Sequence, residues 1–273
     1  MPKFTSQIKL YRKLRYRKGY GVHSPFIYNL ITKVIEEKTP YYIFDEIEKF
    51  RNYLLTFKNG VGTVTTEAQH KNYGALLFRL VNFFKCRTVL QIKGSTGIMS
   101  LYLALASRSN CNCYILEENS YLLDAVKKVT EEEQIKNIHF MEGHYNENLA
   151  KLKTEISSFD LIFINEIADT AKIRELLGHS KSFIHKNSIL IIDGINRNKE
   201  MKLFWKKIKN DSNTHVTIDL LALGIVFFEI KLHKQHYKNY FDYGKKQNLH
   251  KKRRRRLNFI SRRKKSTKNK YPD

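Results

Sequence analysis

Short apolar runs alternate with stretches of helical periodicity from residue 88 onward. This alternation is typical of β-α-β units, which build a largely parallel sheet between two layers of helices. The pattern therefore predicts an α/β domain with a Rossmann-like core. Its expected strands cover residues 88–92, 113–117, 138–142, 160–164, 188–192, 215–220 and 224–230.

The last two expected strands differ from the first five. Only about two residues, Ala222 and Leu223, separate them, whereas a crossover between parallel strands needs a dozen or more. They must form an antiparallel hairpin. Five β-α repeats that end in a hairpin give a seven-stranded sheet, unlike the six parallel strands of an ordinary dinucleotide-binding dehydrogenase.

Capping residues mark several expected helices. Ser24 before Pro25 is a favourable N-cap with proline in the first helical position, and Ser120 and Asp169 precede further helical stretches. Upstream of the core, residues 25–37, 41–56 and 67–85 have helical periodicity. We expect three parts: a helical lid or cap packed on the core (1–87), the Rossmann-like core (88–243) and a tail (244–273).

The positive charge is concentrated at the two ends of the chain. Of a net charge of +24, residues 1–20 supply seven lysines and arginines and no acid, and residues 245–273 supply fourteen against the single acid Asp273. Residues 21–244 hold 29 basic and 25 acidic side chains, an ordinary balance. The tail is therefore expected to be disordered and able to bind polyanions.

Cysteine content and hydropathy indicate a cytoplasmic protein. There are three cysteines, and we expect the thiols of Cys111 and Cys113 to point to opposite faces of a strand, so neither disulfides nor a zinc site is predicted. The basic N-terminus lacks the apolar region of a signal peptide, and no stretch approaches about 20 apolar residues.

A glycine-containing turn follows the first core strand. Gln91 closes that strand, and Gly94, Ser95 and Gly97 lead into the next helix. Glycines allow a ligand to approach the backbone, and a helix N-terminus offers free N–H groups. The alternative is that the glycines only allow the helix to pack closely on a strand.

Three further side chains are candidates for the site. Glu117 closes the second strand, where an acid can accept hydrogen bonds from both ribose hydroxyls of a nucleoside cofactor. His144 follows the third strand and is either a contact of the adenine ring or a surface histidine. His23 is either a general base near the site or part of the helix start that Ser24 and Pro25 form.

Several segments together resemble a known family. They are Gly19–Phe26, Tyr73–Phe84, Thr88–Ile92, Gly97–Ala104, Thr217–Leu220 and Gly224–Phe228. They are similar to small class I S-adenosylmethionine-dependent methyltransferases related in fold to the catechol O-methyltransferase group, over roughly residues 17–240. The resemblance implies the seven-stranded sheet, S-adenosylmethionine as cofactor, and a cofactor site made by Gln91, Gly94, Ser95, Gly97, Glu117 and His144.

The chain departs from the family pattern at four positions. Gln91 and Lys93 stand where the family has an acid and a glycine. Asn165 stands where related metal-dependent enzymes place an Asp, and Asn196, after Asp193, breaks a pair of Asp residues. Because magnesium needs several oxygen ligands, no bound metal is predicted.

Two functions follow. In the first, the protein is a methyltransferase of unknown acceptor, with the acceptor held near Asn165 and Asp193 and His23 as the candidate base. In the second, the cofactor site has decayed and residues 245–273 bind RNA or another polyanion. Nucleic acid is favoured over lipid because no amphipathic helix accompanies the charges, and Tyr240, Tyr243 and Phe259 add stacking groups.

Overall fold

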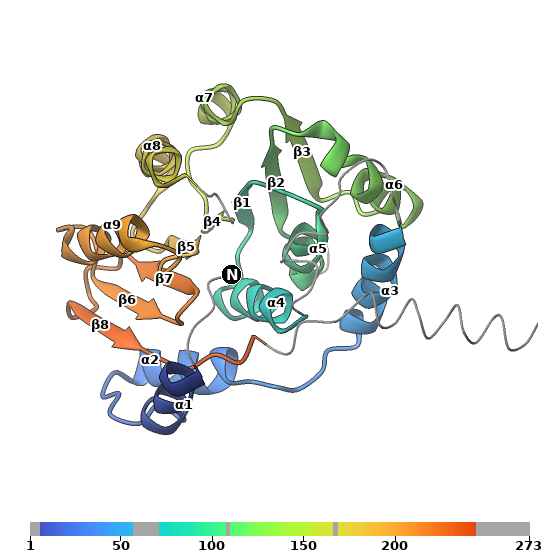
Figure 1. The fold of residues 1–273 in the computed structure, drawn as a ribbon. Helices are drawn as coiled ribbons and strands as arrows, with labels where there is room; N and C mark the ends of the chain where they lie inside the picture. Colours follow the sequence, from blue (N-terminus) through green and yellow to red (C-terminus); the bar gives the residue numbers. More distant parts are fainter. Residues whose placement is uncertain (1–5, 57–70, 108–109, 166–168, 244–273) are drawn as a thin grey trace, which may run out of the picture. The chain divides into compact units, whose positions relative to one another are not determined.

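The computed structural model describes residues 6–56, 71–107, 110–165 and 169–243. One eight-stranded sheet runs through this part of the chain in the order β3-β2-β1-β4-β5-β7-β6-β8 (Figure 1). The strands are β1 (Thr88–Ile92), β2 (Asn112–Glu117), β3 (Ile138–Glu142), β4 (Leu161–Ile164), β5 (Ile189–Asp193), β6 (Val216–Asp219), β7 (Leu223–Phe227) and β8 (Gln235–Lys238).

The first five strands are parallel, and β7 is antiparallel to both β5 and β6. The predicted Rossmann-like fold and its terminal hairpin are thus confirmed. The hairpin turn is tight, with Leu221 in the left-handed region at φ 74°. The bounds of the last two strands were predicted too generously, since β7 ends at Phe227.

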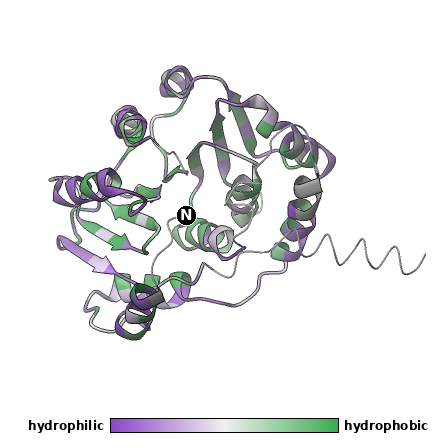
Figure 2. Ribbon diagram, in the orientation of Figure 1, coloured by the Kyte–Doolittle hydropathy of each residue, from purple (hydrophilic) through white to green (hydrophobic). Residues whose placement is uncertain are grey.

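The eighth strand was not predicted. β8 pairs in parallel with β6 at the edge of the sheet, and Tyr237 is its single buried residue. Figure 2 shows this strand as largely hydrophilic, beside the more hydrophobic β6 and β7. An edge strand with one buried residue has no run of apolar positions to reveal it.

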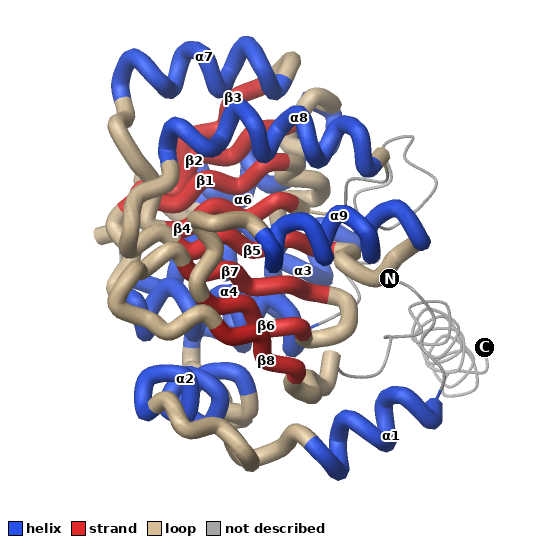
Figure 3. The backbone as a smooth tube through the Cα atoms, turned by 90° about the vertical axis from the view of Figure 1, so that its left-hand side faces the viewer, coloured by secondary structure: helices blue, strands red, loops and turns tan. Residues whose placement is uncertain are grey.

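Helices cover both faces of the sheet. One face packs on α2 (Pro25–Leu30), α3 (Ile43–Thr56), α4 (Lys71–Phe84), α5 (Ile98–Ala104) and α6 (Asp124–Glu132). The other packs on α7 (Tyr145–Glu155), α8 (Thr170–Ser180) and α9 (Lys199–Asn210). A further helix, α1 (Ser6–Arg15), lies at the periphery near β8 (Figure 3).

The helix starts follow the predicted capping chemistry at two of three places. Ser24 accepts a hydrogen bond from the Ile27 N–H at 3.4 Å, with Pro25 in the first turn, and Asp169 accepts one from the Ala171 N–H at 2.7 Å. Ser120 instead begins a short 3₁₀ turn before α6. After α2 the chain continues as a π-helical turn, Ile31–Ile35.

The expectation for the cysteine pair was wrong. The Cys111 and Cys113 sulfurs lie 3.9 Å apart, and both are buried on the same face of the sheet. Side chains alternate between the two faces of a strand, so residues two positions apart point to the same face. The expectation did not apply this alternation.

The division into a lid (1–87), core (88–243) and tail (244–273) stays a prediction, and the tail lies outside the described residues. Among the described helices, none is long and apolar enough to cross a membrane.

Candidate functional site

The turn after β1 has an unusual backbone. Lys93, Ser95 and Gly97 all have positive φ values, of 69°, 53° and 74°. The Lys93 and Gly94 N–H groups both donate to the Leu116 carbonyl, at 2.9 and 3.0 Å, which fixes the turn against the end of β2. The backbone of a glycine-type turn is therefore present although a lysine occupies its first left-handed position.

The two glycines of this turn are required by packing. A Cβ at Gly94 would lie 2.5 Å from Ile115, and one at Gly97 would lie 2.4 Å from Val126 of α6. These distances are too short for any side chain. The turn therefore packs closely on β2 and α6, while ligand approach at Gly94, Ser95 and Gly97 stays a prediction.

Gln91 is fully buried on the face of the sheet that α5 covers. Its Oε1 accepts from the Ser100 hydroxyl at 2.9 Å, and its Nε2 donates to the Lys93 carbonyl at 3.3 Å. The Asn165 Nδ2 donates to the same carbonyl at 3.1 Å. The two amides that replace family acids thus hold the left-handed Lys93 in place together.

Glu117 lies at the carboxyl end of β2 and is only 3% exposed. One carboxylate oxygen accepts from the Ser95 N–H at 2.7 Å and the other from the Asn119 N–H at 3.0 Å. The carboxylate therefore links the turn after β1 to the turn after β2. A carboxylate has about four acceptor positions, so two remain for hydroxyl donors of a ligand.

Asn165 directly follows β4, Asp193 ends the neighbouring β5, and both are buried. The Asp193 Oδ2 lies 3.7 Å from the Arg197 Nη2. The Asn165 Oδ1 is buried and has no hydrogen-bond partner within the described part of the chain. A buried acceptor without a donor is costly, so this atom is suited to a ligand donor.

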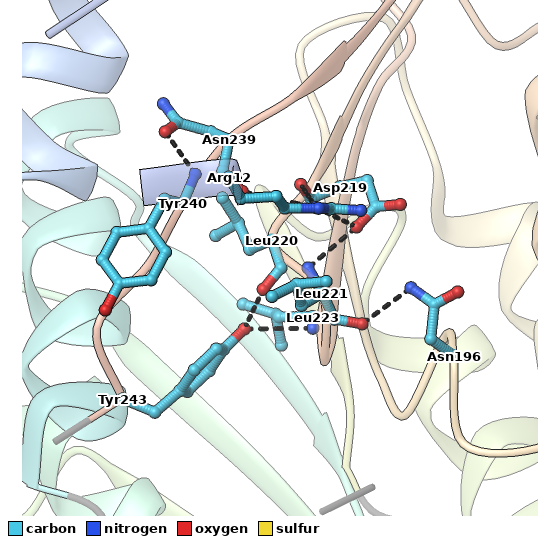
Figure 4. A network of polar contacts seen from close by, with 9 residues as sticks. All are labelled: Arg12, Asn196, Asp219, Leu220, Leu221, Leu223, Asn239, Tyr240 and Tyr243. Carbon is cyan, nitrogen blue, oxygen red and sulfur yellow. Dashed lines mark hydrogen bonds and ion pairs between the residues drawn. The ribbon is translucent and has the colours of Figure 1, made fainter. Parts of the chain in front are cut away.

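The β6–β7 turn supports the loop that follows Asp193. The Gly194 and Ile195 N–H groups donate to the Ala222 carbonyl at 2.7 and 3.2 Å. The Asn196 Nδ2 donates to the Leu221 carbonyl at 2.7 Å (Figure 4). Asn196, which was noted only as a missing acid, therefore has a structural role.

Tyr243 reaches the same turn from the end of the described chain (Figure 4). Its hydroxyl donates to the Leu220 carbonyl at 2.8 Å and accepts from the Leu223 N–H at 3.2 Å. Burial of this hydroxyl, and next the charge of Asp193, raise the pKa of Tyr243 well above its usual range. A ring held in this way is not available to stack on a nucleic-acid base. The sequence did not reveal this structural role, because Tyr243 stands directly before the charged tail.

The two histidines lie apart from each other. His144 precedes α7 with its side chain 80% exposed, and its Nδ1 is 3.9 Å from the Glu118 carboxylate. It borders a pocket of about 230 Å³ lined by Glu118, His144, Tyr145, Asn146, Glu147, Lys172, Glu175 and Leu176. His144 is thus close to the loop after Glu117, as an adenine contact would require.

The helix that begins after His23 packs near the start of β5. Phe26, three residues later, packs against Phe84 and Phe227. Phe227 pairs with Ile189 at the start of β5, whereas Asp193 ends that strand. These contacts locate Phe26 and not His23, so the role of His23 as a general base stays a prediction.

The next question is whether the described residues could bind a metal ion. Among the described residues, no group of three or more His, Cys, Asp and Glu side chains is arranged to hold a metal ion. Asn165 and Asp193 supply one amide and one carboxylate.

Comparisons with a protein-family profile and with solved structures both find methyltransferases. The profile of a family described as "methyltransferase domain" matches residues 87–250. No curated protein matches the chain. Among solved structures, the chain is similar in fold to an O-methyltransferase from Bacillus cereus in complex with SAH, at 16% identity and a TM-score of 0.55 over 74% of this chain and 97% of that one. It is also similar to the O-methyltransferase TomG from Streptomyces achromogenes, involved in tomaymycin synthesis and solved with SAM, at 15% identity and a TM-score of 0.55 over 74% and 95%.

Proposed function

The chain belongs to the methyltransferase-domain family, and on that premise we propose that it transfers the methyl group of S-adenosylmethionine to an acceptor held near Asn165 and Asp193. In this proposal the cofactor binds at the carboxyl ends of β1 and β2. When bound, S-adenosylmethionine supplies an electrophilic methyl group on a sulfonium.

Glu117 is the observation that carries this proposal. Its buried carboxylate stands at the end of β2, has its two oxygens fixed by the backbone of both adjoining turns, and keeps acceptor capacity for two hydroxyls. Nothing in the fold itself requires an acid there, because the same backbone donors could be satisfied by water or by a neutral side chain. The residues present therefore fit a nucleoside.

Neutral amides replace acids around the reacting group. Gln91 and Asn165 orient the turn through the Lys93 carbonyl, and Asn165 keeps a buried acceptor oxygen. Asp193 supplies a buried carboxylate that can orient an acceptor or take its proton. Rate enhancement would come mainly from alignment of the two reactants.

Calorimetric titration with S-adenosylmethionine and S-adenosylhomocysteine tests the proposal. We expect micromolar binding by the wild-type chain, a loss of about tenfold or more in Glu117→Gln, and no change in Glu131→Gln, which removes the same charge from an exposed position on α6. Absence of binding to the folded wild-type protein, or equal binding by both variants, would contradict it.

The second candidate is a methyltransferase fold that no longer binds cofactor and binds a polyanion through residues 245–273. Gln91 and Lys93 favour it, because they remove a negative charge and add a positive one beside the turn. Deletion of residues 245–273 should flatten the salt dependence of RNA binding. Nucleic acid as a partner, and a cytoplasmic location, stay predictions.

A further inference from the structure

Helix α1 contacts the sheet region through a charged residue. Arg12 is buried, and its Nη1 donates to the Asp219 carboxylate and the Asp219 carbonyl, both at 2.9 Å, and to the Asn239 carbonyl at 3.3 Å. Figure 4 shows the guanidinium beside Asp219 at the β6–β7 turn. These contacts fix which side of α1 faces the protein.

Two leucines of α1 point the other way. Leu10 is 58% exposed and Leu14 is 64% exposed. These leucines are four positions apart, so they share a face, and each is two positions from Arg12, which places them about 200° from it around the helix. Tyr11, three positions before Leu14, extends this exposed surface at 58% exposure, whereas Ile8 lies four positions before Arg12, on the side of the anchor.

This arrangement is the reverse of an ordinary surface helix, whose apolar stripe faces the core. Burial of a leucine is favourable by about 1.5–3 kcal/mol. An apolar face held in solvent by a polar anchor on the opposite side is therefore a surface that lacks its partner.

Cations surround the apolar face. Lys9, Lys13 and Arg15 lie on α1, and Arg17 and Lys18 follow it. The first 20 residues contain no acid. The Arg15 guanidinium lies 5.3 Å from the centroid of the Tyr20 ring, which is itself 71% exposed. Apolar, tyrosine and basic side chains together are the composition of a helix that lies in the interface of an anionic membrane.

We propose that α1 docks the protein on an anionic lipid surface, with Leu10 and Leu14 inserted among the acyl chains and the surrounding lysines and arginines at the headgroups. The preference for nucleic acid over lipid concerned the charges of residues 245–273, whereas α1 adds an amphipathic helix at the other basic end of the chain. Phosphate contacts with nucleic acid would use the cations but leave the exposed leucines without a role.

Vesicle flotation with the full chain separates these partners. The vesicles are phosphatidylcholine with about one quarter phosphatidylserine, and pure phosphatidylcholine is the comparison. The test variant is Leu10→Ser/Leu14→Ser, which leaves every charge in place. The matched control is Leu203→Ser on α9, a leucine with the same 58% exposure.

We expect the wild type and Leu203→Ser to float with the anionic vesicles and the double variant to lose about tenfold or more in partition coefficient. Equal flotation of all three proteins would overturn the proposal, because charge alone would then carry the binding. Failure of the wild type to float while it binds an RNA oligonucleotide would also overturn it in favour of nucleic acid. Binding of S-adenosylhomocysteine should be the same in all three proteins, so this result is independent of the proposed methyl transfer.

Discussion

Lys93→Gly removes a backbone strain that the structure locates in the candidate cofactor turn. The left-handed φ of 69° at Lys93 costs an L-residue about 1–2 kcal/mol. Glycine avoids this cost but loses about 0.5–1 kcal/mol through the greater freedom of the unfolded chain. The net expectation is a stabilisation of about 0.5–1 kcal/mol, or roughly 1–4 °C in Tm for a domain of this size.

Lys85→Gly is the matched control, because Lys85 is an exposed lysine with a similar φ of 51° at the end of α4. Thermal unfolding should show similar gains for both variants. Calorimetry should show tighter S-adenosylmethionine binding, by roughly fivefold, in Lys93→Gly alone, since one half-exposed positive charge is removed from the turn. S-adenosylhomocysteine, which lacks the sulfonium charge, should gain less.

A loss of stability in Lys93→Gly beside a gain in Lys85→Gly would refute this reasoning. It would mean that the interactions of the Lys93 side chain outweigh the strain of its backbone.

Three further changes test the same region. Gln91→Glu should lower Tm, since a carboxylate cannot donate to the Lys93 carbonyl as the amide does, while S-adenosylmethionine binds more tightly; calorimetry that shows unchanged affinity would contradict this. Tyr243→Phe should cost about 1–3 kcal/mol in denaturant unfolding. Its deficit should shrink above about pH 10, because the raised pKa of Tyr243 gives the wild type a stability that is present below the unfolded pKa and lost as the pH rises toward the folded one. Arg12→Ala should cost about 1–3 kcal/mol and expose α1 to limited proteolysis, because the contact with Asp219 holds the helix; unchanged digestion would exclude Arg12 as the anchor.

Most core strands could be predicted because they are buried on both faces, although β3 at the edge of the sheet is partly exposed. A parallel strand between two helix layers is a continuous apolar run, as in β4 and β5. β8 has one buried residue and α1 has its apolar side chains in solvent. Neither has the pattern that burial leaves in a sequence, so neither was predicted.

The candidate site could be predicted in position but not in detail. Strand order alone places Glu117 beside the turn after β1, and this was expected. The hydrogen bond from the Ser95 N–H to the Glu117 carboxylate depends on a left-handed backbone at Ser95. This conformation could not be predicted, because residues other than glycine rarely adopt it. His23 was proposed as a general base from its residue type and its place near an expected lid, and this role stays a prediction.

The anchoring of α1 has a consequence for synthesis of the protein. Arg12 contacts residues that are 207 and 227 positions later in the chain. At about 5–20 residues per second, a ribosome needs roughly 10–40 s to reach Asp219 after it has made Arg12. During that interval the first helix has no docking site on its own protein. The whole of α1, with its anchor Arg12, is therefore accessible to chaperones or to a membrane during that time, and α1 takes its place only after the strands that hold it have been made.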